Sequence, residues 1–323
     1  MKLARIYSFL KRDLDIIEES LNEVFQAEHP ILHAASTELL KAGGKRIRPV
    51  FVILSGQLGR YQPDRVKTVA VSLELIHMAT LVHDDVIDDA SLRRGQPTIR
   101  ELYGNRVAMY TGDYILARAL EEITQIEDTP VHQLLSRTIV EVCVGEIEQI
   151  KDKYNWDQGL RDYLRRIKRK TALLIATSCQ LGALVSDLTE AQANNLYKYG
   201  YYIGMSYQII DDILDFTSTE KELGKPSGSD LLQGNITLPV LYAMKDKKFA
   251  SVLKSAIQAN DTLDEEQLGN ILYALKNTDA IEQSYQLSEL YLQKALKALE
   301  ELPEGRAKHT LENIAKYIGK RRS

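Results

Sequence analysis

Cysteine is nearly absent from this chain of 323 residues, which contains only two. Cys143 and Cys179 lie in apolar segments of helical spacing, with neither a Cys-x-x-Cys pair nor a suitably spaced histidine. This pattern predicts two buried free thiols in a reducing compartment and argues against a zinc site.

Long apolar runs and charge of one sign are also lacking. No uninterrupted apolar stretch approaches 18 residues, and the first ten residues lack the apolar core of a signal peptide. The net charge of −4 argues against a protein that wraps nucleic acid. We therefore expect a cytoplasmic globular protein without a membrane-spanning segment, and its length allows a large core.

Proline is scarce, with eight residues, and none interrupts the segments in which apolar residues recur every three or four positions. One such segment runs from Val66 to Asp88, and others lie around residues 139–150 and 203–215. No stretch rich in Gly, Ser or Pro separates two domains. The sequence predicts an all-α protein: residues 1–323 form one domain, a single large helical bundle.

Two aspartate clusters share one form. Asp84, Asp85 and Asp88 make up the first acidic cluster, and Asp211, Asp212 and Asp215 make up the second. On a helix, residues four apart share a face, so each cluster directs two carboxylates to one place. Paired carboxylates favour a hard cation such as Mg²⁺, which prefers to share phosphate oxygens. The expected ligand is a diphosphate bridged by Mg²⁺.

Basic residues accompany both clusters. The segment Gly43–Pro49 places Lys45, Arg46 and Arg48 beside a glycine pair, a composition suited to binding diphosphate oxygens. Arg93 and Arg94 follow the first acidic cluster, and His77 precedes Asp84 by two helical turns. Lys170 ends a basic run, Gln208 precedes Asp211 by three residues, and Lys225 lies in a glycine-flanked loop that suits a lid.

The ordered segments Gly44–Pro49, Asp84–Asp88 with Arg93–Gly95, Lys170–Ala172 and Gly204–Asp215 resemble the signature of the trans-isoprenyl diphosphate synthases over the whole chain. The resemblance implies a helical bundle of the isoprenoid synthase type around a deep central cavity. It also implies three Mg²⁺ ions and the head-to-tail condensation of isopentenyl diphosphate onto an allylic diphosphate.

The resemblance also implies a role for each matching residue. Metal binding falls to Asp84, Asp88 and Asp211, whereas Asp85, Asp212, Asp215 and Asp230 bind metal-bound water or fix nearby cations. Isopentenyl diphosphate lies against Lys45, Arg48, His77 and Arg94. The leaving diphosphate is stabilised by Arg93, Lys170 and Lys225, and the allylic group meets Thr171 and Gln208.

Product length depends on the residues that precede the first acidic cluster. Ala79 and Thr80 are small, whereas short-chain members of the family carry bulky aromatic residues there. The helix from Val69 to Asp84 would line about 22 Å of cavity, at about 1.5 Å per residue. We therefore expect a long-chain product.

Within the family, the chain resembles the large catalytic subunits of two-component hexaprenyl and heptaprenyl diphosphate synthases. That likeness implies a small regulatory subunit as partner and farnesyl diphosphate as the primer. It also implies that the product becomes a menaquinone side chain and that the enzyme lies transiently near a membrane when it releases the product. A homodimeric octaprenyl or solanesyl diphosphate synthase remains an alternative. A terpene cyclase is disfavoured because the second cluster repeats Asp-Asp-x-x-Asp, and a non-catalytic scaffold because no acid or cation is missing.

Overall fold

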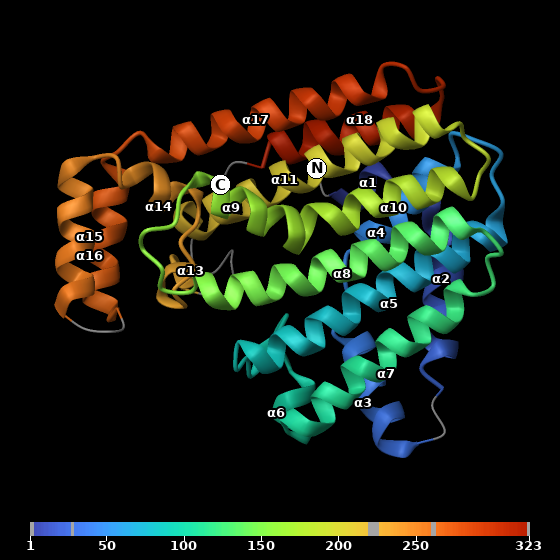
Figure 1. Cartoon of the computed structure of the whole chain (residues 1–323), viewed down its shortest axis with the longest axis horizontal. Helices are drawn as coiled ribbons and strands as arrows, with labels where there is room; N and C mark the ends of the chain where they lie inside the picture. Colours follow the sequence, from blue (N-terminus) through green and yellow to red (C-terminus); the bar gives the residue numbers. More distant parts are fainter. Residues whose placement is uncertain (1–2, 27–28, 219–225, 260–262, 322–323) are drawn as a thin grey trace. The chain divides into compact units, whose positions relative to one another are not determined.

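The computed structural model describes residues 3–26, 29–218, 226–259 and 263–321. Nearly all regular structure in these residues is helical, which confirms the all-α prediction (Figure 1). The elements in the first part of the chain are α1 (Leu3–Ile6), η1 (Ser8–Leu10), α2 (Lys11–Val24), α3 (Pro30–Lys41), α4 (Ile47–Gly56), α5 (Pro63–Ile87), β1 (Leu92–Arg93), β2 (Gln96–Pro97), α6 (Ile99–Tyr103), α7 (Asn105–Ile123) and α8 (Thr129–Asp152).

The second part of the chain continues the helical pattern. Its elements are α9 (Leu160–Ile167), η2 (Lys168–Ala172), α10 (Leu173–Leu184), α11 (Glu190–Thr217), α13 (Ser229–Leu232), α14 (Leu238–Ala243), α15 (Lys247–Ala259), α16 (Glu265–Lys276), α17 (Ala280–Leu299) and α18 (Arg306–Gly319).

The described chain forms two compact units that interleave in sequence. Unit 1 comprises Met1–Ile139, Leu174–Gly200 and Leu299–Ile314, and unit 2 comprises Val140–Leu173, Tyr201–Ala298 and Ala315–Ser323. The boundaries between the units fall inside α8, α11 and α18 or at the ends of other helices. No Gly- or Pro-rich linker marks these boundaries, and the assignment of residues 1–323 to one domain stays a prediction.

Helix α5 is the central element of unit 1, where it contacts α2, α4, α6 and α7. Pro63 occupies its first turn, a position where the missing N–H costs nothing. Apolar residues three and four apart are typical of a helix with one buried face, but residues on every side of α5 are buried between Val66 and Met78. Contacts on every side of α5 therefore fix the helix, and with it the position of the aspartates at its C-terminal end.

Helix α5 also has the length and mean hydropathy of a membrane-spanning segment, although charged residues interrupt its apolar runs. Within the 18-residue stretch of α5 that has this hydropathy, 72% of the helix is buried inside the protein. Contacts within unit 1 account for this apolar character, since a central core helix needs the same composition.

Helices α13 to α16 surround the core of unit 2. Phe216 at the end of α11 and Phe249 in α15 are almost fully buried there, with Leu231, Ile236 and Ile271. Helices α15 and α16 lie side by side, and α16 also contacts α14 (Figure 1). This core packs against the end of α11 that follows the second acidic cluster.

The two cysteines differ from the prediction and from each other. Cys179 is buried as expected, and burial raises the pKa of its thiol to about 12. Cys143 is exposed, so its predicted burial was wrong. Val140 and Ile147, also apolar and also exposed, lie on the same side of α8. The prediction failed because apolar spacing does not reveal which face of a helix packs inward.

Candidate active site

The first acidic cluster lies at the C-terminal end of α5 in unit 1. The backbone N–H of Asp88 still donates to the carbonyl of Asp84 at 2.8 Å, which preserves the helical i, i+4 relation just past the helix end. Asp89 then takes a left-handed conformation, with φ of 54°, and ends the turn. Asp84 and Asp88 remain partly exposed, as a carboxylate pair that takes a cation must be.

Asp85 has a different environment from its two neighbours. It is 4% exposed, and its Oδ1 atom accepts hydrogen bonds from Arg93 Nε at 2.9 Å and Nη2 at 2.8 Å. Such charge-assisted bonds are stronger than neutral ones. Asp85 therefore orients Arg93, in line with its predicted role of fixing a nearby cation.

A short hairpin that the periodicity did not predict carries Arg93 and Arg94. Strand β1 pairs antiparallel with β2, with Arg93 opposite Gln96. The two turn residues Arg94 and Gly95 have φ of 54° and 77°, as a tight two-residue hairpin turn requires. The exposed Arg94 therefore lies at the tip of this hairpin in unit 1.

The segment between α3 and α4 does not present three equivalent cations, as its composition had suggested. Lys45 is exposed and Arg48 is partly buried, whereas Arg46 is 9% exposed and paired with Glu18 and Glu74. A Cβ atom on Gly44 would lie 2.9 Å from Arg94 Nη1, so glycine at this position permits close approach of the hairpin arginine. Arg46 is thus the exception, because two carboxylates already neutralise it.

His77 lies among the arginines of unit 1. Desolvation lowers its pKa well below the ordinary value, and the charges of Arg48, Arg94, Arg93 and Arg46 lower it further, in that order. The imidazole is therefore neutral at physiological pH. With Arg93, Arg94 and Gly43, His77 lines a small cavity of about 10 Å³, room for about one water molecule.

The two residues predicted to control product length lie on α5 between His77 and Asp84. Ala79 is 2% exposed, and Thr80 is partly buried, with its hydroxyl donating to the His77 carbonyl at 2.7 Å. Both side chains are therefore fixed within unit 1. Their role in product length stays a prediction.

In unit 2, Lys170 and Thr171 lie in η2, a π-helical turn between α9 and α10 that the sequence did not reveal. Single π turns inside helices are often found at functional sites. A Cβ atom on Gly204 would lie 2.5 Å from Ala172 Cα, so the glycine lets α11 approach this turn closely. The close approach brings Thr171 to Gln208.

A chain of hydrogen bonds runs through these residues. Thr171 Oγ1 donates to Gln208 Oε1 at 2.7 Å, and Gln208 Nε2 donates to Asp212 Oδ1 at 2.8 Å. Asp212 Oδ2 accepts from the Tyr163 hydroxyl at 2.7 Å. Each member fixes the next, so the oxygen and nitrogen of the Gln208 amide have defined directions.

Asp212 is 3% exposed, and burial together with the charge of Asp230 raises its pKa to about 7. The hydrogen bonds from Gln208 and Tyr163 lower the pKa and limit the rise. Tyr163 was missed by the sequence reasoning, since it lies 49 residues from its partner. Nothing in its local sequence signals the contact.

The other two aspartates of the second acidic cluster have separate partners. Asp211 Oδ1 lies 2.8 Å from Nη1 of Arg321, whose guanidinium also lies over the Tyr207 ring at 5.0 Å from the centroid. Asp215 is 1% exposed, and its Oδ1 accepts from Ser229 Oγ at 3.1 Å. Asp215 therefore also holds the start of α13, a structural contact additional to its predicted metal role.

The remaining predicted residues of unit 2 are Lys170, Asp230 and Lys225. Lys170 Nζ donates to Gln149 Oε1 at 2.9 Å. The backbone N–H of Asp230 donates to Asp215 Oδ2 at 3.3 Å. Lys225 lies outside the described residues.

Arg321 was missed by the sequence reasoning. The basic run at residues 320–322 is the feature of the sequence that could have drawn attention to it.

The donor atoms fit a hard cation. No group of three His, Cys, Asp or Glu side chains able to hold a metal ion occurs among the residues that the structure describes. Each acidic cluster nevertheless offers partly exposed carboxylates. These are Asp84 and Asp88 in the first cluster and Asp211 in the second. Mg²⁺ is commonly held by one or two carboxylates together with water and substrate phosphates, so a set of three protein ligands is not required.

Comparison with known proteins gives one consistent result. The polyprenyl synthetase family matches residues 29–275. The chain is 61% identical over 322 residues to heptaprenyl diphosphate synthase component 2 of Bacillus subtilis, covering 100% of this chain and 92% of the relative.

Two solved structures share the fold. The heptaprenyl diphosphate synthase of Staphylococcus aureus has a TM-score of 0.92 at 44% identity, covering 97% of this chain and 99% of its own. A polyprenyl synthase of Caulobacter crescentus, complexed with calcium and isoprenyl diphosphate, has a TM-score of 0.92 at 28% identity. The match covers 100% of this chain and 98% of the Caulobacter chain. The chain belongs to the polyprenyl synthetase family and is a prenyltransferase of the all-α isoprenoid synthase fold.

Proposed function

We propose that this chain is the catalytic subunit of a long-chain trans-polyprenyl diphosphate synthase that condenses isopentenyl diphosphate onto an allylic diphosphate. The observation that carries the proposal is the grouping of Arg48, Arg93 and Arg94 around a neutral His77 in unit 1. Several guanidinium groups close together suit a diphosphate, whose oxygens accept charge-assisted hydrogen bonds.

Isopentenyl diphosphate is the substrate that this group of cations fits best. Lys45 and Arg94 are exposed, and the Arg94 guanidinium lies close to Gly44, the residue before Lys45, so both side chains reach solvent in unit 1. The neutral His77 adds a hydrogen-bonding group without adding a charge. Lys45, Arg48, His77 and Arg94 would bind and orient the diphosphate, which places the double bond of this substrate for attack.

The allylic diphosphate would use the acidic residues. Asp84, Asp88 and Asp211 would hold about three Mg²⁺ ions with the diphosphate, and bound Mg²⁺ would offset the charge that develops on the leaving group. The calcium and isoprenyl diphosphate of the Caulobacter crescentus structure support dependence on a divalent metal. Arg93, Lys170 and Lys225 would add cations.

Thr171 and Gln208 would supply polar contacts to the allylic group as its bond to diphosphate breaks. The Gln208 side chain is held at both ends, by Thr171 and by Asp212, so its amide need not reorganise during the reaction. The proton lost from the condensation intermediate would pass to the departing diphosphate.

The relatives' names support the finer assignment. Heptaprenyl diphosphate synthase component 2 of Bacillus subtilis is named as one component of an enzyme, which supports a small second subunit for this chain. Buried Ala79 fits a long product because no bulky ring occupies its position. We infer a hexaprenyl or heptaprenyl product made from farnesyl diphosphate for a menaquinone side chain, in the cytoplasm.

The test is a product assay. Labelled isopentenyl diphosphate and farnesyl diphosphate are supplied with Mg²⁺, with and without the small subunit, and the product is sized by chromatography. A hexaprenyl or heptaprenyl product that requires the small subunit supports the proposal. A long product without it would favour a homodimeric octaprenyl or solanesyl diphosphate synthase. A cyclised product or no turnover would contradict prenyl chain elongation.

A further inference from the structure

We propose that Arg46 is a positioning residue: anchored to Glu18 and Glu74, it holds the segment Gly43–Arg48 so that Lys45 and Arg48 face isopentenyl diphosphate. This inference rests on the proposed function, which assigns those two cations to that substrate. Arg46 itself would not touch the diphosphate, although it lies between the two residues that would.

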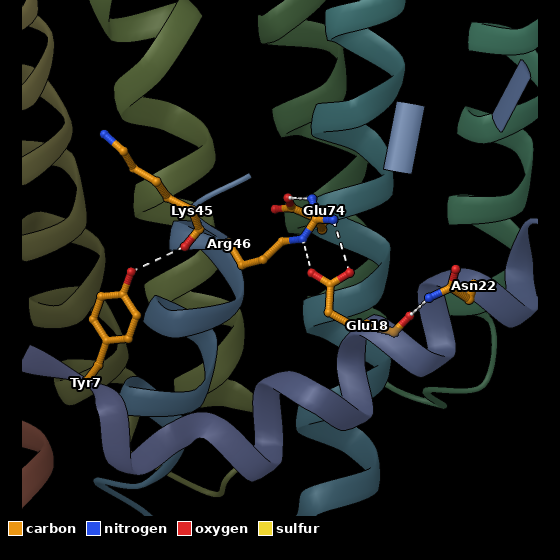
Figure 2. Close-up of polar contacts among 6 residues, drawn as sticks. All are labelled: Tyr7, Glu18, Asn22, Lys45, Arg46 and Glu74. Atoms are coloured by element: carbon orange, nitrogen blue, oxygen red, sulfur yellow. Dashed lines mark hydrogen bonds and ion pairs between the residues drawn. The ribbon is translucent and has the colours of Figure 1, made fainter. Parts of the chain in front are cut away.

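The Arg46 side chain is tied to two helices of unit 1 (Figure 2). Its Nε and Nη2 atoms donate to the two carboxylate oxygens of Glu18 in α2, the second bond at 3.1 Å. Its Nη1 atom donates to Glu74 Oε1 in α5 at 3.0 Å. The planar guanidinium fork is suited to this bidentate geometry, which lysine cannot reproduce.

The anchor explains an unfavourable backbone conformation. Arg46 has φ of 46° and ψ of 40°, in the left-handed region that non-glycine residues rarely adopt. The preceding carbonyl of Lys45 accepts a hydrogen bond from the Tyr7 hydroxyl at 3.3 Å, and the Arg46 carbonyl accepts the first α4 bond from Val50 at 3.1 Å. Such conformations persist where surrounding contacts fix them.

The left-handed turn separates neighbouring side chains. In Figure 2 the Lys45 side chain points away from that of Arg46, which runs toward Glu18 and Glu74. Arg48 follows two residues later, in the first turn of α4, so the same turn sets where that helix begins. The position of both cations therefore depends on the conformation at residue 46.

The charges agree with a positioning role. Burial lowers the pKa of Arg46, but Glu18 and Glu74 together more than offset this, and the net shift is upward. Glu74 Oε2 is buried and has no hydrogen-bond partner among the residues that the structure describes. A diphosphate that approached Arg46 would be repelled by the two carboxylates, which carry charge of the same sign. The diphosphate is therefore expected to bind Lys45 and Arg48 instead.

The test compares substituted enzymes, each assayed with the small subunit, for the KM of isopentenyl diphosphate, the KM of farnesyl diphosphate and the thermal midpoint. Arg46→Met removes the anchor. Arg46→Gly also removes it, and because glycine enters the left-handed conformation readily but is not held there, the chain can fold while the turn stays unanchored. Glu18→Gln, at a half-exposed position, weakens the anchor and leaves Glu74 in place. Arg65→Met, which removes an ion pair with Asp128 elsewhere in unit 1, is the control.

Both Arg46 variants are expected to raise the KM of isopentenyl diphosphate by about 10- to 100-fold, the size of effect found when a residue that orients a metal ligand is replaced. Glu18→Gln is expected to have a smaller effect in the same direction. The KM of farnesyl diphosphate should change by less than about threefold, and Arg65→Met should change neither KM. Arg46→Lys should not restore the wild-type value, because lysine lacks the fork.

Lys45→Ala separates this inference from the proposed function. If Lys45→Ala raises the KM of isopentenyl diphosphate but Arg46→Gly and Glu18→Gln leave it unchanged, the positioning role is overturned and the substrate assignment stands. If Lys45→Ala also leaves it unchanged, both are overturned. Equal increases for the two substrates in the Arg46 variants, accompanied by a lower thermal midpoint, would show a purely structural role and would also overturn the proposal.

Discussion

Replacing Asp212 by asparagine should stabilise the metal-free enzyme at neutral and alkaline pH. Asparagine has nearly the shape of aspartate and can keep both hydrogen bonds. Its Oδ1 accepts from Gln208, and its Nδ2 donates to the Tyr163 oxygen. The substitution therefore removes the buried charge and leaves the polar chain in place.

The size of the effect follows from the pKa of Asp212, which burial raises from 3.8 to about 7. Between these values the folded protein keeps a proton that the unfolded chain has lost, so the stability of the wild type falls as pH rises from about 4 to about 7. The loss is complete above the folded-state pKa. A difference of about three pKa units corresponds to on the order of 4 kcal/mol.

The assay is thermal unfolding followed by circular dichroism from about pH 4 to about pH 8, with EDTA present. For cooperative unfolding of a chain of 323 residues, on the order of 4 kcal/mol corresponds to about 6 °C in the thermal midpoint. The advantage of Asp212→Asn should therefore grow with pH and level off above about pH 7. Asp157→Asn, at an exposed position, controls for the substitution itself. An advantage that does not vary with pH would refute the reasoning.

Three further predictions concern turnover and product. Asp84→Ala and Asp211→Ala should each abolish turnover with an unchanged circular dichroism spectrum, a loss of about 3 kcal/mol or more of transition-state stabilisation. Near wild-type rates at saturating Mg²⁺ would contradict the metal assignment. Ala79→Phe should shorten the product, sized by chromatography with the small subunit present, because a packed helix cannot easily yield to an added ring. An unchanged product from an active variant would mean that chain length is set elsewhere. Arg321→Met should reduce the Mg²⁺ concentration for half-maximal rate by up to about fivefold, because a partly exposed ion pair with Asp211 is worth up to about 1 kcal/mol. An increased requirement would show that Arg321 assists metal binding.

The sequence by itself determined the elements that carry the acids. Apolar residues at helical spacing predicted the long helix that ends at the first acidic cluster, and the i, i+4 relation of Asp84 and Asp88 survives in the backbone bond between them. The second cluster likewise lies on one helix, α11. These features depend on spacing along the chain, which is local and can be read without knowing the packing.

Tertiary structure decided what each charged side chain contacts. Arg46 looked equivalent to Lys45 and Arg48 in the sequence, and only the approach of α2 and α5 shows that Glu18 and Glu74 neutralise it. The contact of Tyr163 with Asp212 spans 49 residues, and that of Arg321 with Asp211 joins the chain end to α11.

The burial of α5 on every side and the exposure of Cys143 have the same origin. Helical spacing identifies apolar residues but not the neighbours that cover them, so it did not reveal the burial of α5 on every side and gave the wrong environment for Cys143. Periodicity follows from bonds between residues four apart. Pairing and burial follow from residues that only folding brings together, and these set both the pKa of His77 and the pKa of Asp212.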